Sequence, residues 1–195
     1  MQLKLKPWYP KQFQEGCDDG DWRIKSITAC QRYLKSLMPV PNPWPKSDST
    51  SLRRFYGEFG DENNLVTITF PFPEFYEGKP VKTTRVHKKC AASFLRVLND
   101  IFTRYHDRKD IMDTIADFSG VFNFRFKAGG GVSYSLHADG AAADFDADDN
   151  DMNSHWPRQA DMPLEIIECF AREGWVSGGA FWGYDAMHFE ATNIN

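Results

Sequence analysis

The segment SLHADGAAAD, residues 135–144, combines a histidine with an aspartate seven positions later. Residues 141–147 are predicted to form a strand, in which successive side chains point to opposite faces. Asp144 is then expected on the open face, with Asp146, while Phe145 enters the core. The small residues before Asp144 allow the preceding turn to fold closely and bring the His137 loop over the strand. This segment therefore predicts that an imidazole and a carboxylate reach one cleft.

A second segment, YDAMHFE at residues 184–190, carries His188 and Glu190 on one face of a predicted final strand. A single histidine is more often a structural or surface residue than a metal ligand. Two imidazoles and one carboxylate, however, form a recurrent catalytic zinc set that leaves the fourth position for water. The two segments together predict a Zn²⁺ site made by His137, Asp144 and His188.

A metal-activated hydrolase also needs a base beside the metal that takes the proton of the attacking water. Asp185 lies three residues before His188, at the end of a turn that contains glycine and tyrosine. Its position fits this role. The alternative is an aspartate that only caps the turn.

The two segments resemble the motifs of a known family. The pattern SxHxxGxAxD is matched from Ser135 to Asp144, and the pattern DxMHFE is matched from Asp185 to Glu190. This is similar to the zinc D-alanyl-D-alanine carboxypeptidases of peptidoglycan, a family that includes D-Ala-D-Ala dipeptidases and the L-alanyl-D-glutamate endopeptidases of phage endolysins. The resemblance covers roughly residues 55–195, and the Gly-Trp and Gly-Gly pattern before His188 is typical of the endolysin-like branch.

The resemblance implies an α+β fold, in which a small antiparallel sheet carries the zinc site and packs against helices, as in D,D-peptidases and hedgehog-like proteins. It also implies that His137, Asp144 and His188 bind zinc and that Asp185 is the general base. Arg125, in the segment FNFRF, is then expected to meet the substrate carboxylate or the developing oxyanion. The alternative for Arg125 is an ordinary arginine at a strand edge.

Two further positions near the first motif matter. Ser135 is expected either to brace the histidine loop or to bind substrate. Asp139 is a departure, because many relatives have an aromatic residue near this position, so the packing of the pocket is left open.

Three functions are compatible with these motifs. The first is an endolysin-type L-alanyl-D-glutamate endopeptidase that cleaves peptidoglycan stem peptides, and the second is a D-alanyl-D-alanine carboxypeptidase. The third is a zinc-stabilised cell-wall-binding module without turnover. Asp185 favours an enzyme, because a structural zinc site needs no base and usually has a fourth protein ligand.

The N-terminal region has a different character. Residues 22–37 place Ile24, Cys30 and Leu34 at helical spacing, and a proline-rich segment follows. We therefore divide the chain into a helical extension with a proline-rich linker, residues 1–50, and a catalytic domain, residues 51–195.

Further elements follow from local patterns. LVTITFPF, residues 65–72, predicts a strand ended by prolines, and a helical stripe that begins at Val86 predicts a helix over residues 84–107. Residues 163–173 predict another helix, with Pro163 near its start and a glycine just after its end.

Composition limits the partners. The formal net charge of −4 and the interleaved charges argue against nucleic acid, and no apolar run has the length of a membrane span. The four cysteines, Cys17 among them, are widely spaced and predicted to be free thiols. The start of the chain lacks a secretory pattern, so we expect a protein that is made in the cytoplasm and acts on the cell wall after release. We also expect a monomer. The acidic run DFDADDND, residues 144–151, is read as a solvated loop rather than a calcium site.

Overall fold

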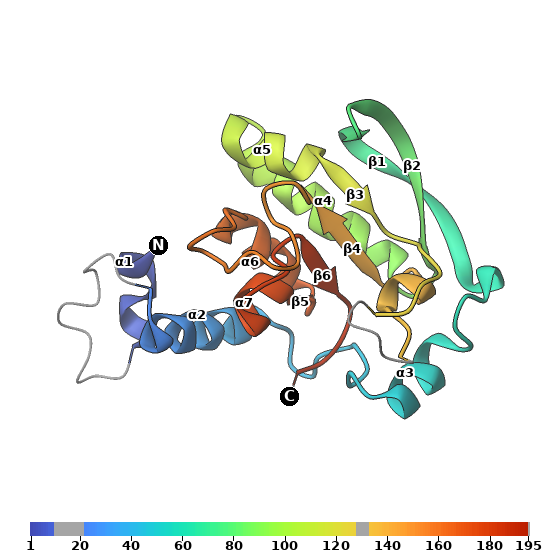
Figure 1. Cartoon of the computed structure of the whole chain (residues 1–195), viewed down its shortest axis with the longest axis horizontal. Coiled ribbons are helices and arrows are strands. Elements are labelled where there is room, and N and C mark those ends of the chain that lie inside the picture. Colours follow the sequence, from blue (N-terminus) through green and yellow to red (C-terminus); the bar gives the residue numbers. More distant parts are fainter. Residues whose placement is uncertain (10–21, 128–132, 195) are drawn as a thin grey trace.

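The computed structural model describes residues 1–9, 22–127 and 133–194, which form an α+β fold with small antiparallel sheets (Figure 1). Its helices are α1 (Gln2–Leu5), α2 (Ile24–Leu37), α3 (Ser49–Tyr56), α4 (Ala91–Tyr105), α5 (Lys109–Ala116), α6 (Leu164–Arg172) and α7 (Gly178–Trp182). Its 3-10 turns are η1 (Lys6–Trp8), η3 (Glu62–Asn64) and η4 (Leu136–Asp139). Its strands are β1 (Leu65–Tyr76), β2 (Lys79–His87), β3 (Phe118–Gly120), β4 (Ala142–Phe145), β5 (Val176–Ser177) and β6 (His188–Glu190).

The central element is a four-stranded antiparallel sheet with the strand order β3-β4-β6-β5. Strands β4 and β6 are far apart in the sequence, yet Asp144 pairs directly with His188 and Ala142 with Glu190. Directly opposite residues of an antiparallel pair have Cβ atoms about 4.5–5.5 Å apart on one face. This register therefore brings Asp144 and His188 together.

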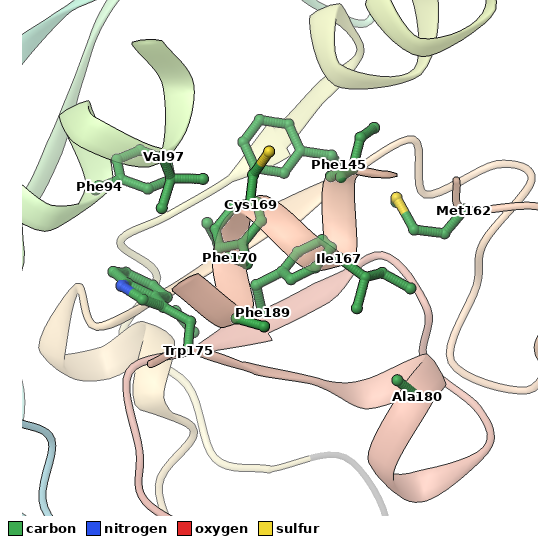
Figure 2. Close-up of a cluster of buried hydrophobic side chains, with 14 of the residues drawn as sticks. Phe94, Val97, Phe145, Met162, Ile167, Cys169, Phe170, Trp175, Ala180 and Phe189 are labelled. Carbon is green, nitrogen blue, oxygen red and sulfur yellow. The ribbon is translucent and has the colours of Figure 1, made fainter. Parts of the chain in front are cut away.

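The opposite face of this sheet enters the core. Phe145 of β4 and Phe189 of β6 are fully buried, and Phe189 stacks on Phe170 of α6 with ring centroids 3.9 Å apart (Figure 2). Phe94 of α4 and Trp175 pack on the same cluster. Burying each such side chain contributes about 1.5–3 kcal/mol to the stability of the fold. Because side chains alternate along a strand, burial of the two phenylalanines leaves the polar residues of β4 and β6 on the opposite face.

The helix predicted over residues 84–107 begins later than expected. Ala91 is its first residue, and the preceding segment is the strand β2, which pairs with β1. Val86 is buried on that strand and not on the helix. The apolar spacing from Val86 to Cys90 fits a helix by coincidence, whereas the β-branched pair Thr83 and Thr84 favours an extended chain.

The strand predicted over residues 65–72 instead continues to Tyr76. Pairing with β2 is interrupted between Thr69 and Glu74, where the register shifts, and it then resumes. Proline lacks an N–H group and is tolerated at irregular positions of edge strands. β1 belongs to a two-stranded ribbon, so its prolines interrupt the ladder without ending the strand.

Two other predicted helices are confirmed. The segment 22–37 contains α2, with Cys30 and Leu34 fully buried, although Ile24 is 76% exposed and was wrongly expected on the buried face. Helix α6 follows Pro163, as predicted from its punctuation.

The N-terminal region lies against the rest of the described chain. Helix α2 lies against α6 and α7, and Gln31 Nε2 donates to the carbonyl of Ala180 at 3.1 Å. In the proline-rich segment, Trp44 Nε1 donates to the carbonyl of Glu173 at 2.8 Å. The division at residue 50 stays a prediction. Cys17 lies outside the described residues, whereas Cys30, Cys90 and Cys169 are buried free thiols. Within the described ranges, no helix has the length and apolarity needed to cross a bilayer.

Candidate metal centre

A short loop fixes the position of His137. The residue lies in η4, and its own N–H group is capped because Ser135 Oγ accepts a hydrogen bond from His137 N at 3.4 Å. Gly140 ends the turn with φ = +65°, and a Cβ there would lie 2.7 Å from Leu65 Cδ2. Glycine therefore permits both the left-handed conformation and the close approach to β1, which fold the loop over β4.

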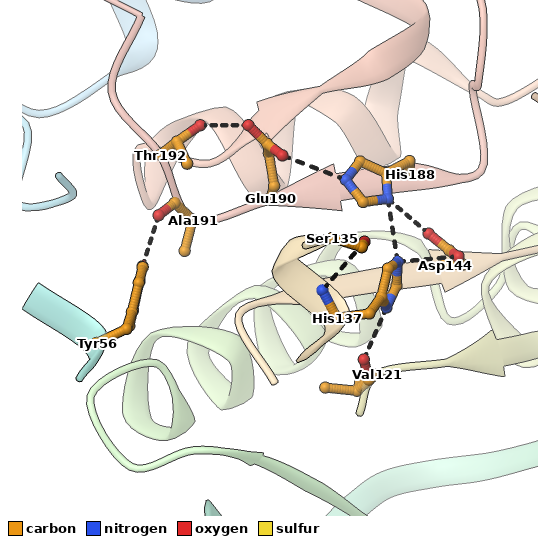
Figure 3. A network of polar contacts seen from close by, with 9 residues as sticks. All are labelled: Tyr56, Val121, Ser135, His137, Asp144, His188, Glu190, Ala191 and Thr192. Carbon is orange, nitrogen blue, oxygen red and sulfur yellow. Dashed lines mark hydrogen bonds and ion pairs between the residues drawn. The ribbon is translucent and has the colours of Figure 1, made fainter. Parts of the chain in front are cut away.

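Three buried side chains meet above β4 and β6 (Figure 3). His137 Nε2 lies 3.1 Å from Asp144 Oδ2 and 3.2 Å from His188 Nδ1. His188 Nδ1 lies 2.9 Å from Asp144 Oδ1. The structure thus brings together the three residues predicted to bind zinc, with one donor atom from each within 4.8 Å of the others.

The outer nitrogen of each imidazole has its own acceptor. His137 Nδ1 lies 2.7 Å from the carbonyl oxygen of Val121, and His188 Nε2 lies 3.4 Å from Glu190 Oε2. A carbonyl oxygen only accepts, so Nδ1 of His137 must donate, and a carboxylate favours donation by His188. In the neutral rings, the inner nitrogens therefore point their lone pairs at each other and at a carboxylate.

This arrangement needs a cation at its centre. Donor atoms about 2.0–2.1 Å from a tetrahedral zinc are roughly 3.3 Å apart. The inner imidazole nitrogens are 3.2 Å apart, and those of His137 and His188 lie 3.1 Å from Oδ2 and 2.9 Å from Oδ1 of Asp144, respectively. Hydrogen bonds from outer histidine nitrogens to carbonyl or carboxylate groups are also typical of metal-bound imidazoles. The donor set fits a zinc ion, which His137, Asp144 and His188 would hold.

Without a metal, a proton fills the same electrostatic role. Burial alone would lower the pKa of His188, but Asp144 and Glu190 raise it to about 10. Burial would raise the pKa of Asp144, yet the two histidines hold it well below its usual range. The site therefore stabilises positive charge between the rings.

Asp185 lies beside this cluster in an unusual conformation. Its φ is +60°, which is uncommon outside glycine, and its carbonyl accepts a hydrogen bond from His188 N at 3.1 Å. Its Oδ1 is buried without a hydrogen-bond partner among the described residues. Burial raises the pKa of this carboxyl, an effect that His188 opposes. A partly buried carboxylate with one oxygen free of hydrogen bonds among the described residues, beside the candidate metal ligands, is suited to accept a proton.

Asp144 and His188 line a pocket of about 310 Å³. One part of its wall carries Arg125 and Lys127, and another carries the partly exposed aromatic rings of Trp182 and Tyr184. The lining residues are Arg125, Lys127, Ser135, Leu136, Asp144, Met152, Trp182, Tyr184, Asp185, Met187, His188 and Glu190. The pocket therefore contains every residue named as catalytic or substrate-binding from the sequence, and the cluster is open to a ligand on this side.

Sequence reasoning missed one contact next to the metal loop. Asp139 is buried, and Arg53 of α3 donates to both of its carboxylate oxygens, at 3.2 and 2.6 Å. The guanidinium also lies 3.1 Å from the centroid of the Phe59 ring. No local pattern in the sequence indicates this contact, because the partner of Asp139 lies 86 residues away.

Apart from Asp144, the acidic run does not join the cluster. Asp146 follows the end of β4 with φ = +52° and accepts a hydrogen bond from Asn150 Nδ2, so it leaves the strand alternation that was predicted. Among the described residues, the acidic groups of positions 146–151 do not form a metal-type group with three ligand atoms close together.

Comparison with protein families gives one match. Residues 128–191 match a family model described as D-alanyl-D-alanine carboxypeptidase. The match spans less than half of the chain and includes His137, Asp144, Asp185 and His188 but not Arg125. Comparison with curated proteins and with solved structures gives no match.

Proposed function

We propose that this chain is a zinc metallopeptidase that hydrolyses an amide bond in peptidoglycan stem peptides, as an L-alanyl-D-glutamate endopeptidase. The observation that carries the proposal is the geometry of His137, Asp144 and His188, whose inner donor atoms lie 2.9–3.2 Å apart while the outer imidazole nitrogens have acceptors. The family match supports a peptidase that acts on cell-wall peptides.

Each residue of the pocket has a role in this proposal. Zinc, when bound, supplies a Lewis acid that acidifies water and polarises the amide carbonyl. Asp185 accepts the proton of the attacking water and returns it to the leaving amine. Arg125 binds the substrate carboxylate or the developing oxyanion.

Two more residues support the donors. Ser135 caps the turn that carries His137, and Glu190 orients the ring of His188. Glu190 is itself held by a hydrogen bond of 2.6 Å from Thr192 Oγ1. Such outer contacts orient metal ligands and raise their basicity.

A D-alanyl-D-alanine carboxypeptidase is the second candidate, and the description of the matched family favours it. In both reactions the residue that provides the leaving amine carries a free α-carboxylate, so the same arginine serves either substrate. A zinc-stabilised binding module is the third candidate. The open pocket and the unpartnered Asp185 argue against it.

The test is digestion of purified cell walls by the full chain, with and without a chelator, followed by mass spectrometry of new termini. New N-terminal D-glutamate supports the endopeptidase, and free D-alanine supports the carboxypeptidase. Zinc binding without any new terminus would leave the binding module as the remaining candidate.

A further inference from the structure

Arg125 and Lys127 share one face of an extended segment. Residues 123–127 run antiparallel to 133–137, with hydrogen bonds from Ser135 N to the Arg125 carbonyl at 3.1 Å and from Lys127 N to the Ser133 carbonyl at 2.8 Å. Alternate side chains of an extended chain point the same way. Both cations accordingly line the pocket.

The alternate residues of this segment, Phe124 and Phe126, point to the other side. Phe124 and Phe126 stack on Tyr134, with ring centroids 5.1 and 4.4 Å apart. This stacking stabilises the segment on its face opposite the pocket. The two cations are therefore presented by an ordered element.

Within the described part of the chain, neither cation has a close protein partner. Among the described residues, the side chains of Arg125 and Lys127 form no ion pair of 4.0 Å or less and no hydrogen bond. Their charges act at longer range on different acids, that of Arg125 on Asp185 and that of Lys127 on Glu190. Two unpaired cations in one pocket favour an anionic ligand.

The spacing of the cations distinguishes one anion from two. The Cα atoms of residues i and i+2 of an extended chain are about 6.6 Å apart, whereas the two oxygens of one carboxylate are far closer than that. This backbone spacing, together with the different acids that the two charges act on, favours binding of two separate carboxylates over sharing of one.

We propose that Lys127 is a specificity-determining residue that binds a second carboxylate of the substrate, while Arg125 binds the carboxylate beside the scissile amide. This inference rests on the proposed function. The ligand class is a stem peptide with two free carboxylates. The second one belongs either to the side chain of a diaminodicarboxylic acid in the third position of the stem or to the C-terminus of a trimmed stem.

Three synthetic tripeptides separate these sources. Each contains L-alanine, γ-linked D-glutamate and a diaminodicarboxylic acid, and they differ only in amidation: none, the side-chain carboxylate, or the C-terminal carboxylate. The zinc-loaded full chain is expected to lose about tenfold in kcat/KM when the carboxylate bound by Lys127 is amidated. The position of that amide identifies the source.

The variant Lys127→Met tests the assignment. Its ratio of kcat/KM between the free and the amidated peptide is expected to fall to about one, because the ammonium that distinguishes them is removed. Lys82→Met is the matched control, since Lys82 is an exposed lysine of β2 outside the pocket, and it should keep the wild-type ratio. A Lys127→Met protein with normal zinc content and an unchanged ratio would overturn the proposal.

Failure of the proposed peptidase function can be distinguished from failure of the proposal for Lys127. If the wild-type chain cleaves none of the three peptides, the peptidase assignment for this bond fails. Calorimetric binding of the same peptides then decides the role of Lys127. A wild-type preference of about tenfold in Kd that Lys127→Met abolishes supports the second carboxylate site, whereas equal affinities for all three peptides refute it.

Discussion

Arg53 Nη2 lies 2.6 Å from Asp139 Oδ2, so an arginine of α3 is joined to the turn that carries His137. The Asp139 side chain is 1% exposed and the Arg53 side chain 20% exposed. The pair is bidentate, because Nη1 of Arg53 also donates to Oδ1 of Asp139. It connects a helix outside the matched family region to the metal loop.

Arg53→Ala is expected to lower the free energy of unfolding by about 3 kcal/mol, because it leaves a buried carboxylate without its partner. Urea denaturation measures this loss. The double variant Arg53→Met with Asp139→Leu should lose less free energy of unfolding than the sum of the losses in Arg53→Met and in Asp139→Leu, since it leaves no unpaired charge. Additive losses would show that the two residues do not interact in solution.

Removal of the metal is expected to lower the melting temperature and to abolish turnover. A ligand at about 1,000 times its Kd stabilises the folded state by about 4.1 kcal/mol, and a chelator removes this contribution. Scanning calorimetry with and without chelator measures the shift. His106→Ala is the control, because His106 is an exposed histidine at the end of α4. The chelator should lower the melting temperature of His106→Ala as it does that of the wild type, whereas it should not change that of His188→Ala.

Zinc binding is expected to release about one proton at neutral pH. His188 holds a proton in the metal-free protein because Asp144 and Glu190 overcome the effect of burial and raise its pKa to about 10. Zinc takes the place of that proton, so the apparent affinity should rise with pH until this pKa is reached. Titration calorimetry in buffers of different ionisation enthalpy counts the protons. A heat that is the same in every buffer would contradict the expectation.

Asp185→Asn is expected to retain zinc and to lose kcat on the order of 10²–10⁴-fold, the usual contribution of a general base. In the metal-free chain burial raises the pKa of this carboxyl, whereas the positive charge of a bound zinc ion would lower it. Zinc content measured on the same preparation separates loss of the base from loss of the metal. An active Asp185→Asn variant would remove this residue from the mechanism.

The three candidate metal ligands were predicted from local patterns, whereas the contact between them depends on strand register. Side-chain alternation predicted that Asp144 and His188 lie on the face of the sheet opposite the hydrophobic core. This is confirmed, because the next residues, Phe145 and Phe189, are fully buried in that core. That Asp144 lies directly opposite His188 depends on how two strands 44 residues apart align. A shift by one residue would have placed the carboxylate on the other face.

The errors have a related cause. Val86 matches helical spacing with Cys90, and only its pairing with β1 shows that it lies in a strand. Arg53 carries no motif, and its role appears only when α3 packs beside the turn at Asp139. Local sequence therefore predicted periodicity and chemistry, while long-range packing determined strand boundaries and the supports of the site.

Glu74 is expected to make stability fall as the pH rises. Both of its oxygens are buried without hydrogen bonds among the described residues, and burial, with Asp117, raises its pKa to about 9. Between the unfolded value of about 4.3 and 9, the folded state holds a proton that the unfolded state lacks. The free energy of unfolding should therefore decrease with pH by at most about 1.4 kcal/mol per unit.

Urea denaturation at several pH values, with Glu74→Gln, tests this. The variant should be more stable than the wild type at pH 8 and should show a weaker decrease with pH. Glu77→Gln makes the same charge change at an exposed position of the same hairpin and should behave as the wild type. Equal pH dependence in the wild type and Glu74→Gln would show that Glu74 is not the titrating group.

Gly178→Ala is expected to impair catalysis more than Gly179→Ala. A Cβ at Gly178 would lie 2.3 Å from the carbonyl oxygen of Asp185, a backbone atom that cannot move without shifting the proposed base. A Cβ at Gly179 would lie 2.9 Å from the side chain of Ala186 and 3.1 Å from its Cα. The two changes are chemically identical and adjacent. A comparison of kcat, zinc content and melting temperature between the two variants therefore measures the effect of displacing Asp185. If Gly178→Ala keeps the wild-type kcat, then catalysis does not depend on the placement of Asp185 that the structure shows.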